Sequence, residues 1–291
     1  MNKIIILGHE NPDVDSIVSG YLLEKIMTIK GYDVEFIIPD KKIEEEVLNV
    51  CRRFNLEPTK FMKNYNLNNK YKKYILVDHN ERILKGNIIC IIDHHPTSKK
   101  IDIDNYYNKK ISSTACYIAR NNEKLLNEYD LKLACLATLV DTASFHSTKS
   151  QKEDEIWVNN LCKKYNFNYK ELYEIGLCLT PLDNLKSASL NGLKKYNFEN
   201  IKVESSYIQI DKLNEDKINK ILKLLRKYIT IKKIDVFVFI IHNMCDFKTS
   251  YYLITDNNLE LRTYNKYTSR GNTIMPEVEN KLKITKSIKT K

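Results

Sequence analysis

Short apolar runs rich in isoleucine and valine alternate with longer stretches that suit a helix in the first hundred residues of this sequence. A strand needs only a few buried residues and an amphipathic helix needs several turns, so this alternation predicts strands joined by crossover helices. Such a pattern is typical of a parallel sheet, because parallel neighbours cannot be joined by a tight turn. We expect strands at 4–7, 34–38, 74–77 and 88–92, and helices at 16–30 and 42–54.

The pattern changes twice along the rest of the chain. Segments 114–127, 131–142 and 152–165 have helical periodicity and predict a helical layer that covers the sheet. From residue 201 onward a second, smaller α+β unit is predicted, with strands at 203–210, 236–241, 251–255 and 260–264 and a long helix at 215–228. The predicted fold is therefore α/β, with a parallel-sheet domain at 1–184, a smaller α+β domain at 190–291, and a frayed, solvated end from residue 281.

Composition limits the setting in which this chain works. Its apolar runs fall far short of the roughly 18 residues of a membrane span, and the run after Met1 stops at His9 without the features of a secretory signal. The seven cysteines include no CxxC pair and fit buried thiols in a reducing compartment. We expect a cytoplasmic protein with no membrane partner. The formal charge of +10 favours an anionic ligand only weakly, because the lysines are spread along the chain.

Histidine and aspartate gather where the predicted strands end. The segment His9 to Ser16 follows the first strand, and by itself the Pro12-Asp13 turn with a helix cap explains it equally well. The next two strands, however, end in Asp78-His79-Asn80-Glu81 and Asp93-His94-His95. Because the carboxyl ends of parallel strands meet at one edge of a sheet, these side chains are expected close together. Asp141, at the end of an apolar helix, adds another carboxylate.

A cluster of carboxylates repels itself unless cations lie between them. Carboxylate and imidazole ligands without a thiolate favour Mn²⁺, Mg²⁺, Co²⁺ or Fe²⁺. Two such ions about 3.5–4 Å apart are a familiar arrangement for hydrolysing phosphate esters and anhydrides, because they activate a water to hydroxide at neutral pH. The sequence therefore predicts a metal-dependent phosphohydrolase.

The four segments, in this order, resemble the motifs of the DHH phosphoesterase superfamily. The forms Asn-Pro-Asp-x-Asp-Ser and Val-Asp-His-Asn-Glu are most similar to its manganese-dependent (family II) inorganic pyrophosphatases. Ser112-Ser113-Thr114-Ala115 and the Ser269-Arg270 segment with Pro276 also resemble family signatures, so the resemblance covers roughly the whole chain.

The resemblance implies a role for each site residue. It implies two or more Mn²⁺ ions, for which Co²⁺ or Mg²⁺ can substitute, and no binding residues for any other cofactor. It places His94 toward the substrate, Arg270 on a phosphate from the second domain, and the active site in the cleft between the domains. Lys194 best matches a family lysine, with Lys195 as a competitor. The implied metal ligands are His9 and Asp13 on one ion, Asp15, His95 and Asp141 on the other, and Asp78 bridging both.

The departures from the family pattern bear on the substrate. Gly271 and Asn272 stand where the family carries two lysines, and each charge-assisted hydrogen bond lost costs about 1.5–3 kcal/mol. Metal-dependent hydrolysis of pyrophosphate is the leading hypothesis. An exopolyphosphatase is the closest alternative, ahead of a DHH oligonucleotide phosphodiesterase and a non-hydrolytic phosphate sensor.

The sequence leaves two further points undecided, the position of the residues after Asp141 and the oligomeric state. His146 and Lys149 follow Asp141 and either approach the phosphate site or lie in an exposed loop. The resemblance implies a homodimer with pyrophosphate or polyphosphate as substrate, and nucleic acid is not expected as a partner.

Overall fold

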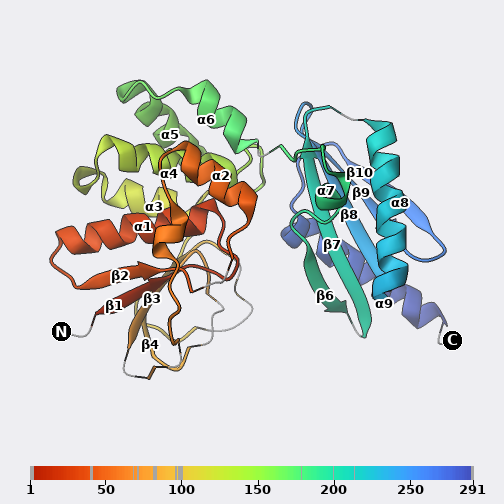
Figure 1. Cartoon of the computed structure of the whole chain (residues 1–291), viewed down its shortest axis with the longest axis horizontal. Coiled ribbons are helices and arrows are strands. Elements are labelled where there is room, and N and C mark those ends of the chain that lie inside the picture. The colour runs from red at the N-terminus through yellow and green to blue at the C-terminus, as the bar shows by residue number, and fades with distance from the viewer. Residues whose placement is uncertain are drawn as a thin grey trace. The chain divides into compact units, whose positions relative to one another are not determined.

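The computed structural model describes residues 3–39, 42–67, 69–70, 72–80, 84–95, 97, 101–177, 179–198, 200–212 and 214–289. The chain divides into two compact units, one of Met1–Phe145 with Lys149–Gly176 and one of His146–Thr148 with Leu177–Lys291. Figure 1 draws both units along the chain. The domain limits predicted from the sequence, 1–184 and 190–291, stay a prediction.

The first unit is built on a five-stranded sheet in the order β2-β1-β3-β4-β5. All of its neighbouring strands are parallel, as the alternating pattern predicted. The chain leaves β1 toward β2 on one side and later returns to β3 on the other side, so the carboxyl ends of β1 and β3 flank a point where the strand order reverses. The strands are β1 (Ile4–Leu7), β2 (Val34–Ile37), β3 (Lys73–Val77), β4 (Asn87–Asp93) and the short β5 (Tyr106–Asn108), which was not predicted.

Alternate residues of these strands are buried on opposite faces of the sheet. Ile6 and Ile75 lie in the core formed with the helices, whereas Ile5 and Tyr74 lie in a smaller core on the other face. Figure 1 shows the helices of this unit on one side of the strands. These helices are α1 (Val14–Ile29), α2 (Glu45–Arg53), α3 (Thr114–Asn121), α4 (Glu128–Asp141), α5 (Lys152–Lys164) and α6 (Tyr169–Gly176), with 3₁₀ turns η1 (Pro58–Phe61) and η2 (Glu123–Leu125).

Local capping decides where two of these helices begin and end. The predicted helix 114–127 stops at Asn121, and the chain makes the turn η2 before α4 begins. A capping box between Asn127 and Asp130 satisfies both backbone groups at the start of α4. With this box α4 begins at Glu128, three residues before the start predicted from the periodicity.

The second unit contains a mixed five-stranded sheet in the order β10-β9-β8-β7-β6. Only β7 and β8 are parallel among these pairs, and α8 (Glu215–Lys232) connects them. Helices α7 (Leu185–Ser189) and α8 pack on one face of this sheet and α9 (Met275–Lys289) on the other, after the π-helical turn η3 (Arg270–Ile274). The strands are β6 (Lys194–Phe198), β7 (Ile201–Ile210), β8 (Val236–Asn243), β9 (Lys248–Ile254) and β10 (Leu259–Tyr264).

The predicted fold class is confirmed, with a parallel sheet in the N-terminal part and a mixed sheet in the C-terminal part. The prediction of a frayed end from residue 281 is wrong up to residue 289, because α9 runs on to Lys289. Met275 and Val278 of this helix, with Ile274 just before it, are buried against the sheet. Among the described residues, no helix combines the length and the apolar composition that a membrane crossing needs.

Candidate metal centre

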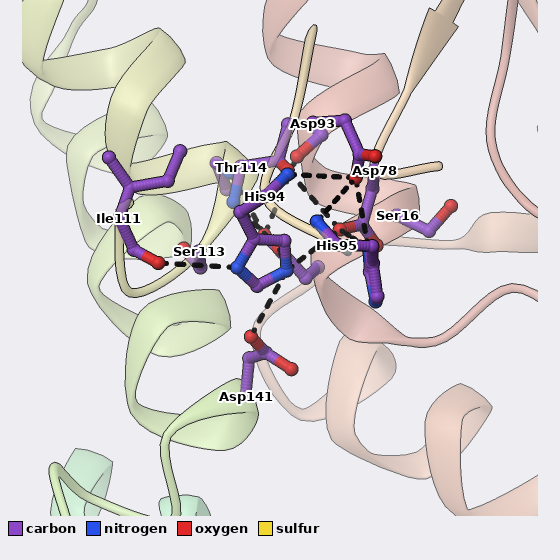
Figure 2. A network of polar contacts seen from close by, with 12 residues as sticks. Ser16, Asp78, Asp93, His94, His95, Ile111, Ser113, Thr114 and Asp141 are labelled. Atoms are coloured by element: carbon purple, nitrogen blue, oxygen red, sulfur yellow. Dashed lines mark hydrogen bonds and ion pairs between the residues drawn. The ribbon is translucent and has the colours of Figure 1, made fainter. Parts of the chain in front are cut away.

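The predicted ligands of the first unit meet at the carboxyl edge of its sheet. His9 and Asp13 follow β1, Asp78 follows β3, and His94 follows β4. Figure 2 shows His94 between Asp78 and Asp141, the last residue of α4. Among the described residues, three overlapping groups have ligand atoms within 4.8 Å of one another, namely His9, Asp13 and Asp78, then Asp15, His94 and Asp141, then Asp78, His94 and His95.

A close backbone approach shapes the loop after β1. A Cβ atom on Gly8 would lie 2.1 Å from the hydroxyl of Ser16, which accepts a hydrogen bond from the backbone N–H of His9 at 3.1 Å. Asp13 caps α1 by accepting from the backbone N–H of Ser16 at 3.0 Å. The cap and the metal-ligand interpretations of this segment are therefore compatible, because capping uses only one of the two carboxylate oxygens of Asp13.

The first group gathers around the imidazole of His9. Its Nε2 lies 3.4 Å from Oδ2 of Asp13 and 3.5 Å from Oδ2 of Asp78. Its Nδ1 is 2.9 Å from the backbone oxygen of Glu10. A ring held at Nδ1 by a carbonyl presents Nε2 to the carboxylates, which is the usual arrangement of a metal-ligating histidine.

The second group gathers around His94 in the same way. Its Nε2 lies 3.5 Å from Oδ2 of Asp141 and 3.9 Å from Oδ2 of Asp15. Its Nδ1 is 3.3 Å from the backbone oxygen of Ile111, as Figure 2 shows. The side chain of His94 is only 2% exposed.

Asp78 lies between the two groups. Its Oδ2 faces His9, and its Oδ1 lies 3.3 Å from Nε2 of His94. The backbone of Asp78 has a left-handed φ of 63°, which costs free energy for a residue with a side chain. One carboxylate thus contacts both histidines, as a ligand shared by two ions would.

The N-terminus of α3 holds two of the carboxylates. The backbone N–H groups of Thr114 and Ala115 donate to the two oxygens of Asp15 at 2.8 and 2.9 Å. The hydroxyl of Thr114 donates to Oδ1 of Asp78 at 3.2 Å. The sequence showed only that residues 112–115 resemble a family segment, and their role in orienting these carboxylates appears only in the structure.

The structure places His94, and not His95, beside Asp15 and Asp141. The resemblance implied His95 beside Asp15 and Asp141, yet His94 occupies that position. His95 is 42% exposed, and its Nδ1 lies 2.9 Å from Oδ1 of the buried Asp93. Backbone N–H groups of both histidines also donate to Asp93, so this carboxylate fixes the turn that directs the two rings differently.

Crowded carboxylates dominate the electrostatics of the cluster. Burial alone would lower the pKa of His9, but the carboxylates of Asp13 and Asp78 outweigh it and raise that pKa to about 10. His94 behaves alike, since Asp78 and Asp141 outweigh burial and raise its pKa to about 10. Burial and the neighbouring Asp78 and Asp141 carboxylates raise the pKa of Asp15 well above its usual range. The cluster therefore attracts positive charge, which protons supply when no metal ion is bound.

Three buried ligand atoms of the cluster make no hydrogen bond among the described residues. They are Oδ2 of Asp78, Nε2 of His94 and Oδ2 of Asp141. Buried polar atoms without a partner are rare and costly, and a bound cation would satisfy all three. The donor set and these atoms therefore fit divalent metal ions.

Lys149 is a further member of the cluster that the sequence left undecided. Its Nζ lies 2.6 Å from Oδ1 of Asp141, and its side chain is 29% exposed. Burial would lower the pKa of Lys149, but the Asp141 carboxylate outweighs burial and keeps it above its usual range, so the group is an ammonium. The contact between Asp141 and Lys149 depends on the conformation of the loop between them, so no helical or strand spacing in the sequence predicts it.

Arg270 and Lys194 lie together in the second unit. The Arg270 guanidinium donates to the backbone oxygen of Gly192 at 2.6 Å and lies over the ring of Tyr207. Lys194 pairs with Ser205 across β6 and β7, so it shares a sheet face with Tyr207, whereas Lys195 pairs with Glu204 on the opposite face. The register thus places Lys194 and not Lys195 on the face of Arg270.

Parts of the quoted motifs lie outside the described residues. These are Glu81, Pro96 and, within η3, the side chain of Asn272. Gly271 is described, and a Cβ atom added there would meet nothing within 4 Å. His79 is described but turns its Nδ1 to the backbone oxygen of Val77 and belongs to none of the three groups.

Comparisons of the sequence and of the structure with known proteins both find proteins described as inorganic pyrophosphatases. The DHH family, N-terminal domain, matches residues 3–143. A manganese-dependent inorganic pyrophosphatase of Methanothrix thermoacetophila is 26% identical over 261 residues, 81% of this chain and 80% of that protein. The crystal structure of a Methanococcus jannaschii protein described as a family II inorganic pyrophosphatase superposes with a TM-score of 0.70 and 23% identity, covering 95% of this chain and 98% of that one.

A second solved structure is more distant. An exopolyphosphatase-related protein of Bacteroides fragilis superposes with a TM-score of 0.50 and 15% identity, covering 98% of this chain and 93% of that one. At these identities the structural likeness shows a common fold.

Proposed function

Residues 3–143 form a DHH family, N-terminal domain, and from this premise we propose that the chain is a metal-dependent phosphoanhydride hydrolase whose preferred substrate is inorganic pyrophosphate. The similarity to manganese-dependent inorganic pyrophosphatases extends over about four fifths of the chain. The observation that carries the proposal is a set of linked ligand groups. Asp78 belongs to one group with His9 and Asp13 and to another with His94 and His95, and His94 also belongs to a third with Asp15 and Asp141. Among the described residues, three buried atoms of these groups make no hydrogen bond.

The geometry supports one assignment of the metal ligands. His9, Asp13 and Asp78 would hold one ion, and Asp15, His94 and Asp141 a second. Asp78 would be shared with the second ion, since its Oδ1 lies 3.3 Å from Nε2 of His94. This assignment keeps five of the six ligands implied by the resemblance and exchanges His95 for His94. We propose Mn²⁺ as the ion, since the donors are carboxylates and imidazoles without a thiolate.

Divalent ions at these groups would polarise a phosphoryl oxygen and lower the pKa of a bound water toward neutrality. The chain's own part is to orient the ligands. The α3 N-terminus fixes Asp15, and Thr114 fixes Asp78, so neither carboxylate must reorganise when the substrate enters.

His95 is the candidate for contact with the substrate. Its ring is partly exposed and is oriented through Nδ1 by Asp93, whose second oxygen accepts a hydrogen bond from Asn80 at 2.6 Å. An imidazole oriented by a buried carboxylate suits hydrogen bonding to a phosphate oxygen or delivery of a proton to the departing phosphate. We assign to His95 the role that the resemblance implied for His94.

Arg270 and Lys194 are the candidates for binding the phosphates. Both are cationic, and they share one face of the second sheet near Gly192 and Ser205. A guanidinium matches the geometry of phosphate oxygens and stays charged at all working pH values. Their action at the metal centre, in a cleft between the domains, stays a proposal, as do the homodimer and the cytoplasmic location.

Exopolyphosphatase activity is the second candidate. Gly271 and Asn272 replace two lysines that the family pattern directs at pyrophosphate. Fewer charges at that position suit a substrate whose further phosphates extend the chain beyond two units. Because a side chain at Gly271 would meet open space, the variant Gly271→Lys can restore one of these charges and is expected to shift preference toward pyrophosphate.

The deciding experiment is phosphate release by protein loaded with Mn²⁺ or Co²⁺. The substrates are pyrophosphate, tripolyphosphate, long-chain polyphosphate and a short oligonucleotide, and Asp78→Ala controls for contaminating activity. Fast turnover of pyrophosphate with slow turnover of the longer chains supports the proposal. Preference for longer chains supports the exopolyphosphatase, and no turnover despite bound metal contradicts both and leaves a phosphate sensor.

A further inference from the structure

An unusual turn follows α4 at the metal centre. Ala143, Ser144 and Phe145 have consecutive left-handed φ values of 48°, 55° and 67°. None of them is a glycine, so each is held in a sparsely populated backbone conformation. Such strain persists only where the surrounding structure fixes it, and it concentrates at functional sites.

Specific contacts hold the turn in place. The backbone N–H of Ser144 donates to the oxygen of Leu139 at 2.7 Å, and its hydroxyl donates to the backbone oxygen of Tyr173 at 2.7 Å. Gly176 allows this close packing, because a Cβ atom there would lie 2.4 Å from the Ser144 hydroxyl. Farther along, the N–H of Gln151 donates to the hydroxyl of Ser112 at 2.9 Å. The chain is therefore fixed on both sides of Lys149.

The fixed segment brings one cation to the second ligand group. The Lys149 ammonium contacts Oδ1 of Asp141. Oδ2 of the same carboxylate is buried, makes no hydrogen bond to any residue that the structure describes, and lies 3.5 Å from Nε2 of His94. The Gln151 side chain donates to the backbone oxygen of Lys149 at 2.8 Å. One carboxylate is thus shared between a built-in positive charge and a candidate metal site.

An ammonium and a divalent ion compete for the charge of one carboxylate. Their mutual repulsion across a few ångströms weakens metal binding, and the partial exposure of Lys149 moderates this repulsion without abolishing it. An anionic substrate would offset the positive charge of Lys149 and relieve the repulsion.

We propose that Lys149 is an internal counter-ion of the group Asp15, His94 and Asp141, which keeps its affinity for a divalent ion low until a phosphoanhydride binds. The proposal rests on the proposed function, because it assumes that this group holds metal and that the substrate is anionic. Its consequence is ordered occupation, in which the ion at His9, Asp13 and Asp78 binds first and the second ion binds together with the substrate.

The test is a calorimetric Mn²⁺ titration of metal-free protein, with and without methylenediphosphonate, a pyrophosphate analogue that cannot be hydrolysed. Lys149→Met keeps the length of the side chain and removes its charge. We expect the weaker Mn²⁺ site to bind about tenfold more tightly in this variant. Methylenediphosphonate should reduce the difference in Mn²⁺ affinity at the weaker site between the variant and the native protein.

Three controls accompany the titration. Lys149→Arg keeps the charge and should retain the native affinity. Lys152→Met removes an exposed lysine, 77% accessible and paired with Glu155, and should change nothing. Asp141→Asn should abolish the weaker site and so identify it. A lower melting temperature of metal-free Lys149→Met is also expected, since Asp141 loses its counter-ion.

Weaker Mn²⁺ binding by Lys149→Met would overturn the proposal and show instead that Lys149 positions Asp141 for the metal. Unchanged binding would overturn it too, as would a native protein with no second site. Failure of the proposed function has a different signature, namely two bound ions without turnover of any phosphoanhydride, and in that case the titration in the absence of the analogue still tests the competition.

Discussion

The two units of this chain differ in how their charges are arranged. Residues 177–291 contain 21 lysines and arginines against 12 aspartates and glutamates, so they carry +9 of the net charge of +10. Residues 1–176 are almost neutral, with 26 basic against 25 acidic residues. Yet the acidic cluster lies in this neutral unit, where four carboxylates and three histidines are gathered at one sheet edge. Net charge therefore indicates whether a unit attracts cations or anions. A binding site also requires that the charged side chains lie close together.

This contrast suggests a division of work between the units. The first unit contains the carboxylates and imidazoles proposed to bind metal ions, and the second contains Arg270 and Lys194, proposed to bind phosphate. Metal affinity should then depend on the first unit alone, and phosphate affinity should depend strongly on the second. The following predictions test that division, from the largest expected effect to the smallest.

Asp78→Asn should have the largest effect. Asp78 contacts both histidines, so its loss weakens both ligand groups together, and we expect turnover to fall about a thousandfold or more. Bound metal should be measured by elemental analysis alongside phosphate release. Asp33→Asn, at an exposed carboxylate, is the matched control. Retention of two ions by Asp78→Asn would contradict the shared-ligand assignment.

Acid should weaken metal binding by competition at the histidines. His9 and His94 have pKa values of about 10 without metal, whereas metal ligation needs the neutral ring. Below that pKa each group must release a proton, so affinity at each should fall about tenfold per pH unit, or about a hundredfold from pH 8.5 to pH 6.5. Mn²⁺ titrations in buffers of different ionisation enthalpy measure both the slope and the released protons.

The same pKa shifts affect the metal-free fold. A histidine whose pKa is raised from 6.5 to about 10 stabilises the fold fully below pH 6.5, and this contribution is lost as the pH rises toward 10. Asp15, whose raised pKa favours its neutral form, acts in the same direction. The free energy of unfolding of the metal-free protein should therefore be lower at pH 10 than at pH 7. Equal values would contradict the raised pKa values of these groups.

Arg270→Gln should weaken phosphate binding and leave the affinity for metal ions unchanged. Loss of a charge-assisted hydrogen bond of about 1.5–3 kcal/mol corresponds to a rise in KM for pyrophosphate of about 10- to 100-fold. Steady-state kinetics at saturating Mn²⁺ give KM, and a separate titration gives metal affinity. A drop in metal affinity of the same size would break the proposed division between the units.

The matched pair Lys194→Met and Lys195→Met should give the smallest difference. Only Lys194 shares the sheet face of Arg270, so we expect about a fivefold rise in KM for Lys194→Met and less than twofold for Lys195→Met. Equal effects would show that bulk positive charge, and not the position of one lysine, matters here.

Much of the fold could be predicted from the sequence, because buried strands and helices need apolar residues at regular spacings along the chain. The four predicted strands of the first unit lie within one residue or so of β1 to β4. The short helices α6 and α7 and the strands β5 and β6 were not predicted. The two strands are short or have exposed residues, so no buried period marks them. The helix α9 was missed because its apolar residues, among them Met275 and Val278, are too few to stand out in a basic segment.

The candidate site could be predicted as a set of residues, and less well as a set of roles. Strand ends share an edge in a parallel sheet, so His9, Asp78 and His94 had to be neighbours once the strands were recognised. The exchange between His94 and His95 could not be predicted, since adjacent residues in a turn point in directions that the hydrogen bonds of Asp93 decide.

The sequence by itself determined the parallel sheet, the edge where carboxylates and histidines collect, and the chemistry that those donors favour, because all three follow from residue type and order along the chain. Only the tertiary structure decided that α3 holds Asp15, that Lys149 reaches Asp141, and that Lys194 shares a face with Arg270. The first two are contacts between residues 99 and 8 positions apart, and the third brings residues 76 positions apart onto one face. Such contacts depend on how strands register and how loops turn, and no local period in the sequence records either of them.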